Sequence, residues 1–361
     1  MKEPKRENRG ITLIALIVTI IVLLILAGVT IATLTGDNGI LTKVSEAKTE
    51  TEKTEEDELR KLTMLEAATN SQNINYYDSN GNKAVIPEGF AVSQIEGEDK
   101  IDTGLVIIDS EGNEFVWIPV GNISNGIEEK NIDFSRYTFD ENGKETKQDS
   151  NIISNYYQEL ETSKDGNISA KDINAFISSV IKNQGYYIAR YEASYGEDRK
   201  PNSKISTGTP ATSENINITE GMLWNWITQE EACEVCQNMY NSKNFTSDLM
   251  NSYAWDTALV FIQTFSNNHN YSMQDGKSLN DKLSNTGTNG DIELNINDIA
   301  GGIRELSTEY SSYISNGYSI PSTIRGGSYY YSDMYASTRR FYIGNKGNDG
   351  LGFRPIIYIN N

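Results

Sequence analysis

Sulfur and imidazole side chains are scarce in this chain. It has two cysteines, Cys233 and Cys236, and one histidine, His269, among 361 residues. The cysteines are three residues apart in a predicted helix, so they cannot link distant parts of the chain, and a disulfide framework is excluded. A single histidine excludes clusters of imidazole metal ligands and most histidine-based proton relays. We therefore expect folding to depend on a hydrophobic core in which both cysteines pack.

Basic residues are also few relative to acidic ones. The chain has 31 Lys and Arg residues against 50 Asp and Glu, which gives a formal net charge of −19. Lys and Arg clusters supply most of the affinity for nucleic acid, so nucleic acid is not an expected partner. The sequence also has no Gly-x-x-x-x-Gly-Lys-Ser/Thr loop and no Gly-x-Ser-x-Gly turn, which removes two common classes of catalytic site.

Charged residues are missing altogether between residues 11 and 36, where Leu, Ile and Val predominate. At about 1.5 Å per residue, a helix of this length crosses a hydrocarbon core of about 30 Å. The stretch is too long for a cleaved secretory signal. Four basic residues precede it and favour a cytoplasmic N-terminus. The sequence thus predicts a membrane-anchored protein with an extracellular head, at the cell surface or in a pilus.

The N-terminal segment carries a more specific pattern. A basic leader ends at Arg9-Gly10, the apolar helix begins at Ile11, and a Glu- and Lys-rich helix follows. This order resembles type IV prepilins and pseudopilins. The resemblance implies cleavage after Gly10, methylation of Ile11, and partners among other pilin-like subunits. Ala15 stands where the family usually has Glu; because a buried charge without its partner is costly, this favours a subunit that caps a fibre. A plain signal anchor is the alternative.

Composition divides the chain into a leader (1–10), a transmembrane and stalk helix (11–71) and a head (72–361) with its core in 104–359. Cleavage of the leader would change the net charge from −19 to −21, because the leader carries four basic and two acidic residues. Residues 42–68 lack Gly and Pro and place Leu59, Leu62 and Leu65 at three-residue spacing, which predicts a mostly solvated helix.

The head shows short helices and strands without regular alternation, which predicts an α+β fold. One helix is expected after a variant cap formed by Ser169 and Asp172, and another after the capping box of Thr228 and Glu231. Their apolar faces are Ile173, Phe176, Ile177, Val180 and Ile181, and Ala232, Val235, Cys236, Met239 and Tyr240. Runs of Val, Ile, Phe and Tyr predict strands at 105–109, 115–120, 186–192 and 353–359, and residues 325–331 also fit a strand.

Six phrases of the head occur together in a fixed order. They are Phe-Val-Trp-Ile-Pro-Val (115–120), Gly-Tyr-Tyr-Ile-Ala-Arg-Tyr-Glu (185–192), Thr-Gln-Glu-Glu-Ala (228–232), Asp-Ile-Ala-Gly-Gly-Ile-Arg-Glu (298–305), Arg-Gly-Gly-Ser (325–328) and Gly-Phe-Arg-Pro (352–355). Their order and spacing resemble the formylglycine-generating enzyme, or sulfatase-modifying factor, family. The resemblance covers about residues 104–359 and implies a variant of the C-type lectin fold.

The same resemblance bears on metals and catalysis. The enzymes of this family hold copper with two thiolates, and the equivalent positions here are Tyr331 and Ala336. Neither can supply a soft sulfur ligand, so no copper and no enzyme activity are expected. The alternative is an enzyme of unrecognised type, or an enzyme of the formylglycine-generating family that uses a different site. The family also binds structural calcium, which implies a Ca2+ site made by the carboxylates of Asp298 and Glu305 and the carbonyls of Gly301 and Ile303.

The last part of the chain concentrates tyrosine among small polar residues. Such a mixture is typical of binding loops, because Tyr offers a large contact area at low entropic cost. The predicted ligand-binding residues are Tyr329, Tyr330, Tyr331, Asp333, Tyr335, Arg340, Phe341, Tyr342, Asn348 and Asp349. In some relatives, diversity-generating retroelements randomise this region while fixed positions, here Met334, are retained. The expected function is adhesin-like binding of an extracellular protein or glycan; a purely structural minor pilin is the alternative.

Overall fold

The computed structural model describes residues 20–21, 23, 40–148, 152–153, 156–159 and 170–361. The chain divides into two compact units, Met1–Glu58 and Leu59–Asn361. Gly10, Ile11 and nearly all of the predicted membrane segment lie outside the described residues. Within the described ones, no helix is both long and apolar enough to cross a membrane.

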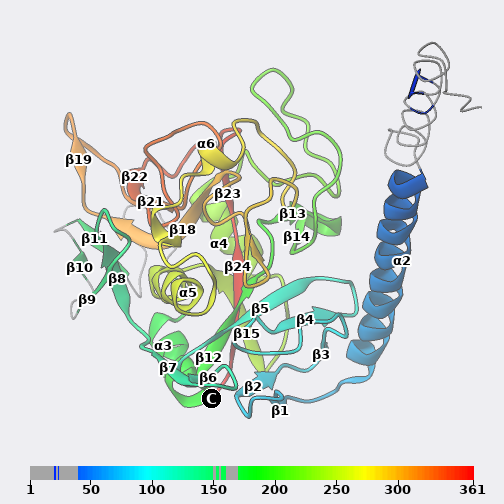
Figure 1. Ribbon diagram of the computed structural model, residues 1–361. Helices are drawn as coiled ribbons and strands as arrows, with labels where there is room; N and C mark the ends of the chain where they lie inside the picture. The colour runs from blue at the N-terminus through cyan, green and yellow to red at the C-terminus, as the bar shows by residue number, and fades with distance from the viewer. Residues whose placement is uncertain (1–19, 22, 24–39, 149–151, 154–155, 160–169) are drawn as a thin grey trace, which may run out of the picture. The chain divides into compact units, whose positions relative to one another are not determined.

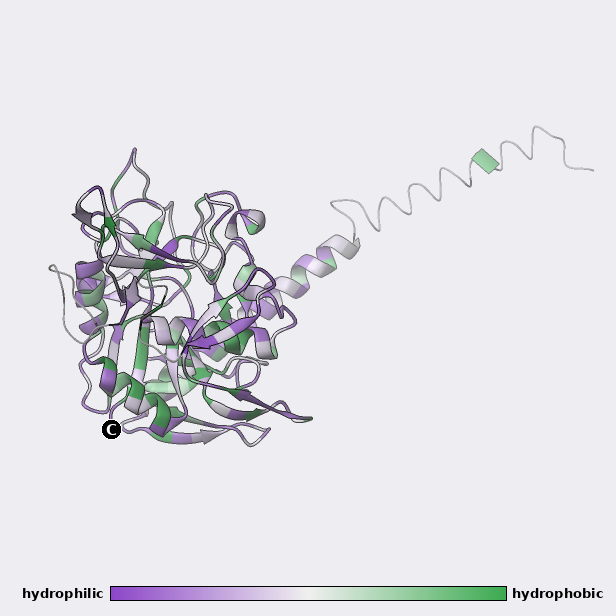
Figure 2. Cartoon of the chain, turned by 90° about the vertical axis from the view of Figure 1, so that its left-hand side faces the viewer, coloured by the Kyte–Doolittle hydropathy of each residue, from purple (hydrophilic) through white to green (hydrophobic). Residues whose placement is uncertain are grey.

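The predicted stalk helix is present as α2 (Ile40–Thr69). Residues 43–58, in the first unit, are exposed throughout, and Figure 2 shows this helix mostly in purple and white. The last turns belong to the second unit, where Thr63 and Ala67 are fully buried. Leu62 and Leu65 are 52% and 66% exposed, which agrees with the mostly solvated helix predicted here.

A six-stranded antiparallel sheet forms the centre of the head (Figure 1). Its order is β15 (Phe245–Leu249), β24 (Pro355–Ile359), β12 (Gly185–Ala189), β5 (Glu114–Pro119), β4 (Val106–Asp109) and β3 (Phe90–Val92). Every residue of β5 is buried: Val116 and Ile118 lie in one hydrophobic cluster, and Phe115 and Trp117 in another on the opposite face. Strands covered on both faces have continuous apolar sequences, which is why four of them were predictable.

A second sheet carries the tyrosine-rich segment. Its order is β10 (Ile152–Ile153), β11 (Tyr157–Gln158), β18 (Arg304–Ser311), β21 (Ser322–Arg325) and β22 (Arg339–Tyr342), and β23 (Leu351–Phe353) pairs with β18 in parallel. Six hairpins complete the strands described: β1 (Ile74–Tyr77) with β2 (Lys83–Ile86), β6 (Gly121–Ser124) with β7 (Glu129–Ile132), β8 (Arg136–Phe139) with β9 (Glu145–Gln148), β13 (Ser194–Tyr195) with β14 (Pro201–Asn202), β16 (Ile292–Glu293) with β17 (Ile296–Asn297), and β19 (Ile314–Ser315) with β20 (Tyr318–Ser319).

Two helices contact both sheets. α4 (Gln229–Gln237) contacts β15 and β18, and α5 (Ser252–Phe265) contacts β5 and β18 (Figure 1). α3 (Ile173–Asn183) packs on β12 and β24, while α6 (Gly276–Leu279), η1 (Glu197–Arg199) and η2 (Tyr271–Met273) are short. The α+β class predicted from the sequence is confirmed, with curled antiparallel sheets.

Several predicted details of the helices need correction. The capping box of Thr228 and Glu231 is confirmed, but α4 ends at Gln237, before Met239. Cys233 was not included in the predicted apolar face, yet it is fully buried. At α3 the N-cap is Asp172, whose carboxylate accepts a hydrogen bond from the backbone N–H of Ala175, and Ser169, the other residue of the predicted cap, lies outside the described residues. On the predicted apolar face of α3, Ile177 is half-buried and Ile181 is 65% exposed.

Three predicted strands have different bounds in the structure. The strand from residue 186 stops at Ala189, and the run 353–359 is divided at Arg354, whose guanidinium reaches the carbonyl of Ala189 at 2.9 Å. The strand predicted over 325–331 stops at Arg325 because Gly326 has a φ of +84°, which is not a strand conformation. The tyrosines that follow therefore lie in a loop.

Candidate ligand-binding surface and metal site

The tyrosine-rich loop is fixed where it leaves β21. Gly327 lies so close to the turn at 298–303 that a Cβ atom there would overlap the carbonyl oxygen of Ala300. Tyr329 then donates its backbone N–H to the carbonyl of Gly302 at 2.9 Å. These contacts hold the loop against the body of the head, and only a glycine permits the close approach.

None of the ten predicted ligand residues is buried. Tyr330 is 61% exposed and Tyr331 is 41% exposed, whereas Met334 and Ala336 in the same loop are buried. Asp333, Arg340 and Phe341 are exposed, and the half-buried residues are Tyr329, Tyr335, Tyr342, Asn348 and Asp349. The loop thus packs on the head through Met334 and Ala336 and leaves its phenol rings accessible.

Arg304, which was not among the predicted ligand residues, lies among the tyrosines. Its guanidinium carbon is 5.2 Å from the centre of the Tyr331 ring. It donates to the carbonyl of Gly350 at 3.0 Å and to the side-chain oxygen of Asn348 at 3.3 Å. Partial burial lowers the pKa of Arg304 below its usual value. A planar cation stacked near tyrosine suits contact with aromatic, carboxylate or hydroxyl groups of a ligand.

Strand β22 sends its side chains to two different places. Arg340 pairs with Asp333 at 2.7 Å, and the hydroxyl of Tyr342 donates to the carbonyl of Lys346 at 2.9 Å. Phe341, which points the other way along the strand, stacks on Tyr313 with ring centres 3.8 Å apart. We use the name tyrosine surface for eight of the predicted ligand residues together with Arg304: Tyr329, Tyr330, Tyr331, Asp333, Arg340, Tyr342, Asn348, Asp349 and Arg304. The predicted residues Tyr335 and Phe341 are not part of it.

A buried ion network lies beneath β21 and β22. Asp256 on α5 accepts from Arg325 at 2.6 Å and from Arg339 at 2.8 Å. Glu309 on β18 accepts from Arg339 at 2.8 Å and pairs with Arg136. Burial alone would raise the pKa of Asp256, but the surrounding arginines lower it below its usual value. These pairs tie both strands of the hairpin to α5 and so hold the tyrosine surface in place.

Two of the four predicted calcium ligands already have protein partners. One side-chain oxygen of Asp298 accepts from the hydroxyl of Thr286 at 2.7 Å, but the other is buried without a hydrogen-bond partner among the described residues. Glu305 is paired with Arg354 at 2.7 Å. Asp298 therefore retains an oxygen that a cation could use, while the charge of Glu305 is already balanced.

The other two predicted calcium ligands, Gly301 and Ile303, lie in the same turn. The backbone N–H of Gly301 donates to Asp291 at 2.6 Å, and that of Ile303 donates to Glu192 at 2.8 Å. Glu192, which the sequence prediction did not include, is buried and has one oxygen without a partner among the described residues. In the described part of the chain, no three His, Cys, Asp or Glu side chains are grouped as metal ligands.

The reactive side chains are poorly placed for catalysis. Cys233 and Cys236 are fully buried, and burial raises the pKa of both thiols well above the usual value, which keeps them protonated. Ala336, one of the two residues that the resemblance aligns with a thiolate ligand, is buried, and its carbonyl accepts from the indole of Trp255 at 2.9 Å. His269 is exposed, with one ring nitrogen 2.8 Å from the carbonyl oxygen of Gln263.

In comparisons with known proteins, the chain matches no family model, no curated protein and no solved structure.

Proposed function

We propose that this chain is a pilin-like, membrane-anchored protein whose head has a C-type lectin-like fold and binds an extracellular protein or glycan. The binding region is the tyrosine surface. The observation that carries this proposal is the exposure of its aromatic residues beside buried Met334 and Ala336. The proposed role is adhesin-like and non-catalytic, in keeping with the two buried, protonated thiols.

The chemistry of the surface favours recognition of a large ligand. Tyr329, Tyr330 and Tyr331 meet edge to face, with ring centres 6.2 Å and 4.9 Å apart along the series. Such rings contribute apolar area and a hydroxyl with little side-chain entropy to lose. Arg304 and Arg340 add cationic donors at the same face, and Asp333 and Asp349 add acceptors.

Retroelement diversification of this surface remains a hypothesis that the packing supports. Residues accessible to a ligand could vary with little effect on folding, whereas Met334 and Ala336 are buried at 1% and 0% exposure and could not. The check lies in the gene neighbourhood. We expect a near-copy of the segment encoding residues 329–349 that differs only at adenines, next to a reverse transcriptase gene. If neither is present, the hypothesis is removed.

The binding proposal is tested with the full chain in detergent on glycan and surface-protein arrays. Replacing Tyr330 and Tyr331 by serine should reduce binding to any captured ligand at least tenfold, because two central rings are lost. Tyr77→Ser is the matched control, since Tyr77 is 62% exposed but lies on β1. Equal loss in both variants, or no loss in the double variant, would refute the tyrosine surface as the binding site.

The calcium site stays a prediction. If Ca2+ binds at Asp298, Gly301, Ile303 and Glu305, it acts as a structural ion that stabilises the turn on which the tyrosine loop packs. The same arrays are therefore run with and without a chelator, and the melting temperature is measured in both. A chelator should lower the melting temperature if the ion is bound, and calcium should restore it.

A further inference from the structure

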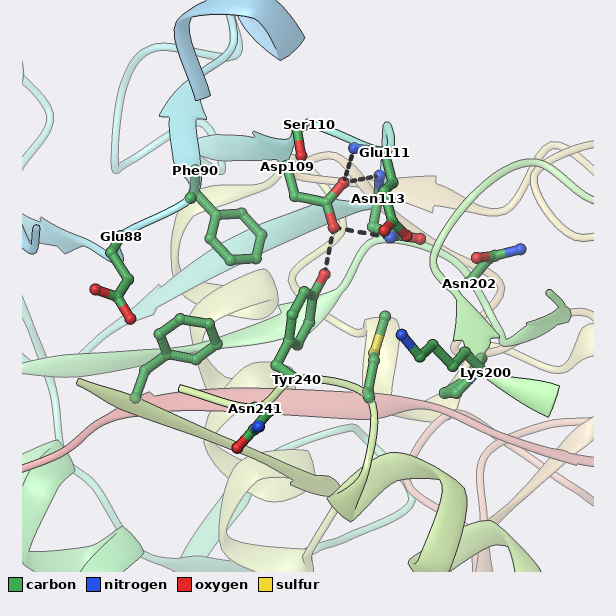
Figure 3. Close-up of a pocket in the computed structure, with 14 residues that line it drawn as sticks. Glu88, Phe90, Asp109, Ser110, Glu111, Asn113, Lys200, Asn202, Tyr240 and Asn241 are labelled. Carbon is green, nitrogen blue, oxygen red and sulfur yellow. Dashed lines mark hydrogen bonds between the residues drawn. The ribbon is translucent and has the colours of Figure 1, made fainter. Parts of the chain in front are cut away.

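A separate concave site lies on a different part of the head. It is enclosed by β3, the turn between β4 and β5, β14 and the segment joining α4 to β15, and its volume is about 280 Å3 (Figure 3). The apolar lining is Phe90, Pro201, Met239, Tyr240 and Phe245, and the polar lining is Glu88, Asp109, Ser110, Glu111, Asn113, Lys200, Asn202 and Asn241. None of these residues belongs to the tyrosine surface. A pocket of this size fits a small group rather than an extended ligand.

The aromatic wall of this pocket is held rigidly. The ring of Tyr240 lies 5.4 Å from Phe90 and 5.5 Å from Phe245, centre to centre, both in edge-to-face contact. Its hydroxyl donates to Asp109 at 2.6 Å, as the dashed line in Figure 3 shows. The phenol is therefore fixed, and its hydroxyl proton is already used by the protein.

The carboxylates of the pocket are oriented but their charge is not balanced. From the part of the chain that the structure describes, Asp109 accepts only from neutral donors: the backbone N–H groups of Glu111 and Asn113, the side-chain amide of Asn113, and the Tyr240 hydroxyl. Glu88 likewise accepts from Ser242 and Asn244, each at 2.6 Å. Among the described residues, neither these two carboxylates nor Glu111 forms an ion pair.

The lining also includes one cation, Lys200, which in Figure 3 lies on the side of Asp109 and Glu111. Lys200 is exposed, forms no ion pair with a described residue, and in Figure 3 extends with its nitrogen toward Tyr240. The pocket therefore has an excess of negative charge beside an apolar aromatic wall. Such a site repels anions and attracts a cation, more strongly as the carboxylates are partly removed from water.

We propose that this pocket binds an ammonium or guanidinium group carried on an aliphatic stem. The stem would lie against Phe90, Met239 and Tyr240, and the cation would be held by Asp109 and Glu111, whose carboxylates lie near each other in Figure 3. A free diamine and the side chain of Lys or Arg in a peptide share this chemistry. The inference is independent of the function proposed for the tyrosine surface, because the two sites have no residue in common.

The test is calorimetric titration of the full chain in detergent with defined probes. N-acetylarginine amide and N-acetyllysine amide represent a peptide side chain, and cadaverine represents a free amine. N-acetylcitrulline amide is the neutral isostere of the arginine probe. We expect binding of at least one cationic probe at millimolar concentration or below, at least tenfold weaker binding of citrulline, and weakening by added salt. Which cationic probe binds best tells the two sources apart.

Variants that remove either a negative or a positive charge from the pocket extend the test. Glu111→Gln should weaken binding of the cationic probe about fivefold, and Lys200→Met should strengthen it by a similar factor. Glu145→Gln, an exposed carboxylate on β9 outside the pocket, should change nothing. Glu111 is exposed, so its substitution should leave folding intact. No heat from any cationic probe, equal binding of citrulline, or weaker binding after Lys200→Met would overturn the proposal.

Discussion

At the residue scale, Asp256 shows how a charge can be buried without becoming neutral. It is fully buried, and its two carboxylate oxygens face Arg325 and Arg339. Asp256→Asn would leave both guanidinium groups without this counter-charge inside the head. We expect a loss of about 3–5 kcal/mol in the free energy of unfolding, as for other broken buried ion pairs, measured by urea denaturation.

A matched substitution distinguishes the effect of burial on an ion pair from the effect of the pairing itself. Asp333 also pairs with an arginine, Arg340, at 2.7 Å, but both side chains are largely exposed. Asp333→Asn should leave the urea midpoint unchanged, because solvent and salt screen an exposed pair. If the two variants lose similar stability, the network under β22 is not the support that we infer.

The contribution of Asp248 to stability depends on pH with a definite sign. Burial raises its pKa to about 7, although the backbone N–H of Lys171 donates to it at 2.6 Å. In the unfolded chain the pKa is about 3.9. Between these values the folded state holds a proton that the unfolded state releases, so this group makes the head less stable as pH rises from about 4 to about 7.

The corresponding measurement compares wild type with Asp248→Asn across that window. The variant cannot ionise, so its urea midpoint relative to wild type should rise between pH 4.5 and pH 7.5. Midpoints of Glu145→Gln provide the reference, since this carboxylate is exposed on β9. A difference between wild type and Asp248→Asn that stays constant with pH would contradict the assigned titration.

Local features at this scale can be read from the sequence. The capping box of Thr228 and Glu231 involves residues three apart and was predicted correctly. Asp78, Asp109 and Asp140 each precede a glycine by three positions and accept backbone N–H groups two and four residues ahead. This repeated turn spacing is equally local, although it was not among the predicted features. The role of Arg304 is not local, because its partners lie more than twenty residues away.

At the scale of elements, helix α5 was not predicted from the sequence, whereas several strands that are buried on both faces were. α5 is almost entirely buried, so its sequence lacks the polar stripe that marks a surface helix. Its cap, Asn251, accepts from the backbone N–H of Ala254 and was the available signal. The strand β5 was predictable because its apolar run is short and rich in β-branched and aromatic residues.

The loop between β21 and β22 depends on a close backbone approach that only glycine allows. Gly327→Ala would force the loop away from the carbonyl of Ala300 and displace Tyr329 from Gly302. We expect a lower melting temperature and loss of ligand capture on the arrays, because the tyrosines would no longer share one face. Gly81→Ala is the comparison: its φ is +85°, but nothing lies within 4 Å of the added Cβ. That variant should lose about 1 kcal/mol and keep binding.

At the scale of the whole molecule, strand order decides which predicted residues meet. Residues 329–349 are close in the sequence, so their proximity could be predicted. Arg304 lies among them because it belongs to β18, which pairs with β21 and β23. The same alternation along β22 sends Phe341 to Tyr313 instead. Pairings between strands far apart in the chain are set by the packed core, so neither outcome could be predicted from composition or spacing.

The boundary between stalk and head gives a prediction for the molecule as a whole. The compact unit begins at Leu59, earlier than the expected start at residue 72. Arg60 pairs with Glu114, which also accepts from Arg190 at 2.9 Å. Asn70 donates from its side-chain amide to the carbonyls of Pro87 and Phe90, each at 2.9 Å. The last turns of α2 are therefore packed and hydrogen-bonded into the head.

Removing those turns should destabilise the head measurably. A fragment of residues 72–361 loses the buried Thr63 and Ala67, the Arg60 pair and the Asn70 bonds, whereas a fragment of residues 59–361 keeps them. We expect the shorter fragment to melt at least about 5 °C lower by calorimetry. The shift in melting temperature is the loss in unfolding free energy, a few kcal/mol, divided by the unfolding entropy, which is large for a domain of this size. Arg60→Met in the longer fragment should account for part of the loss, and Lys61→Met, at an exposed neighbouring position, for none. Equal melting temperatures for the two fragments would place the boundary at residue 72, and α2 would then contribute nothing to the stability of the head.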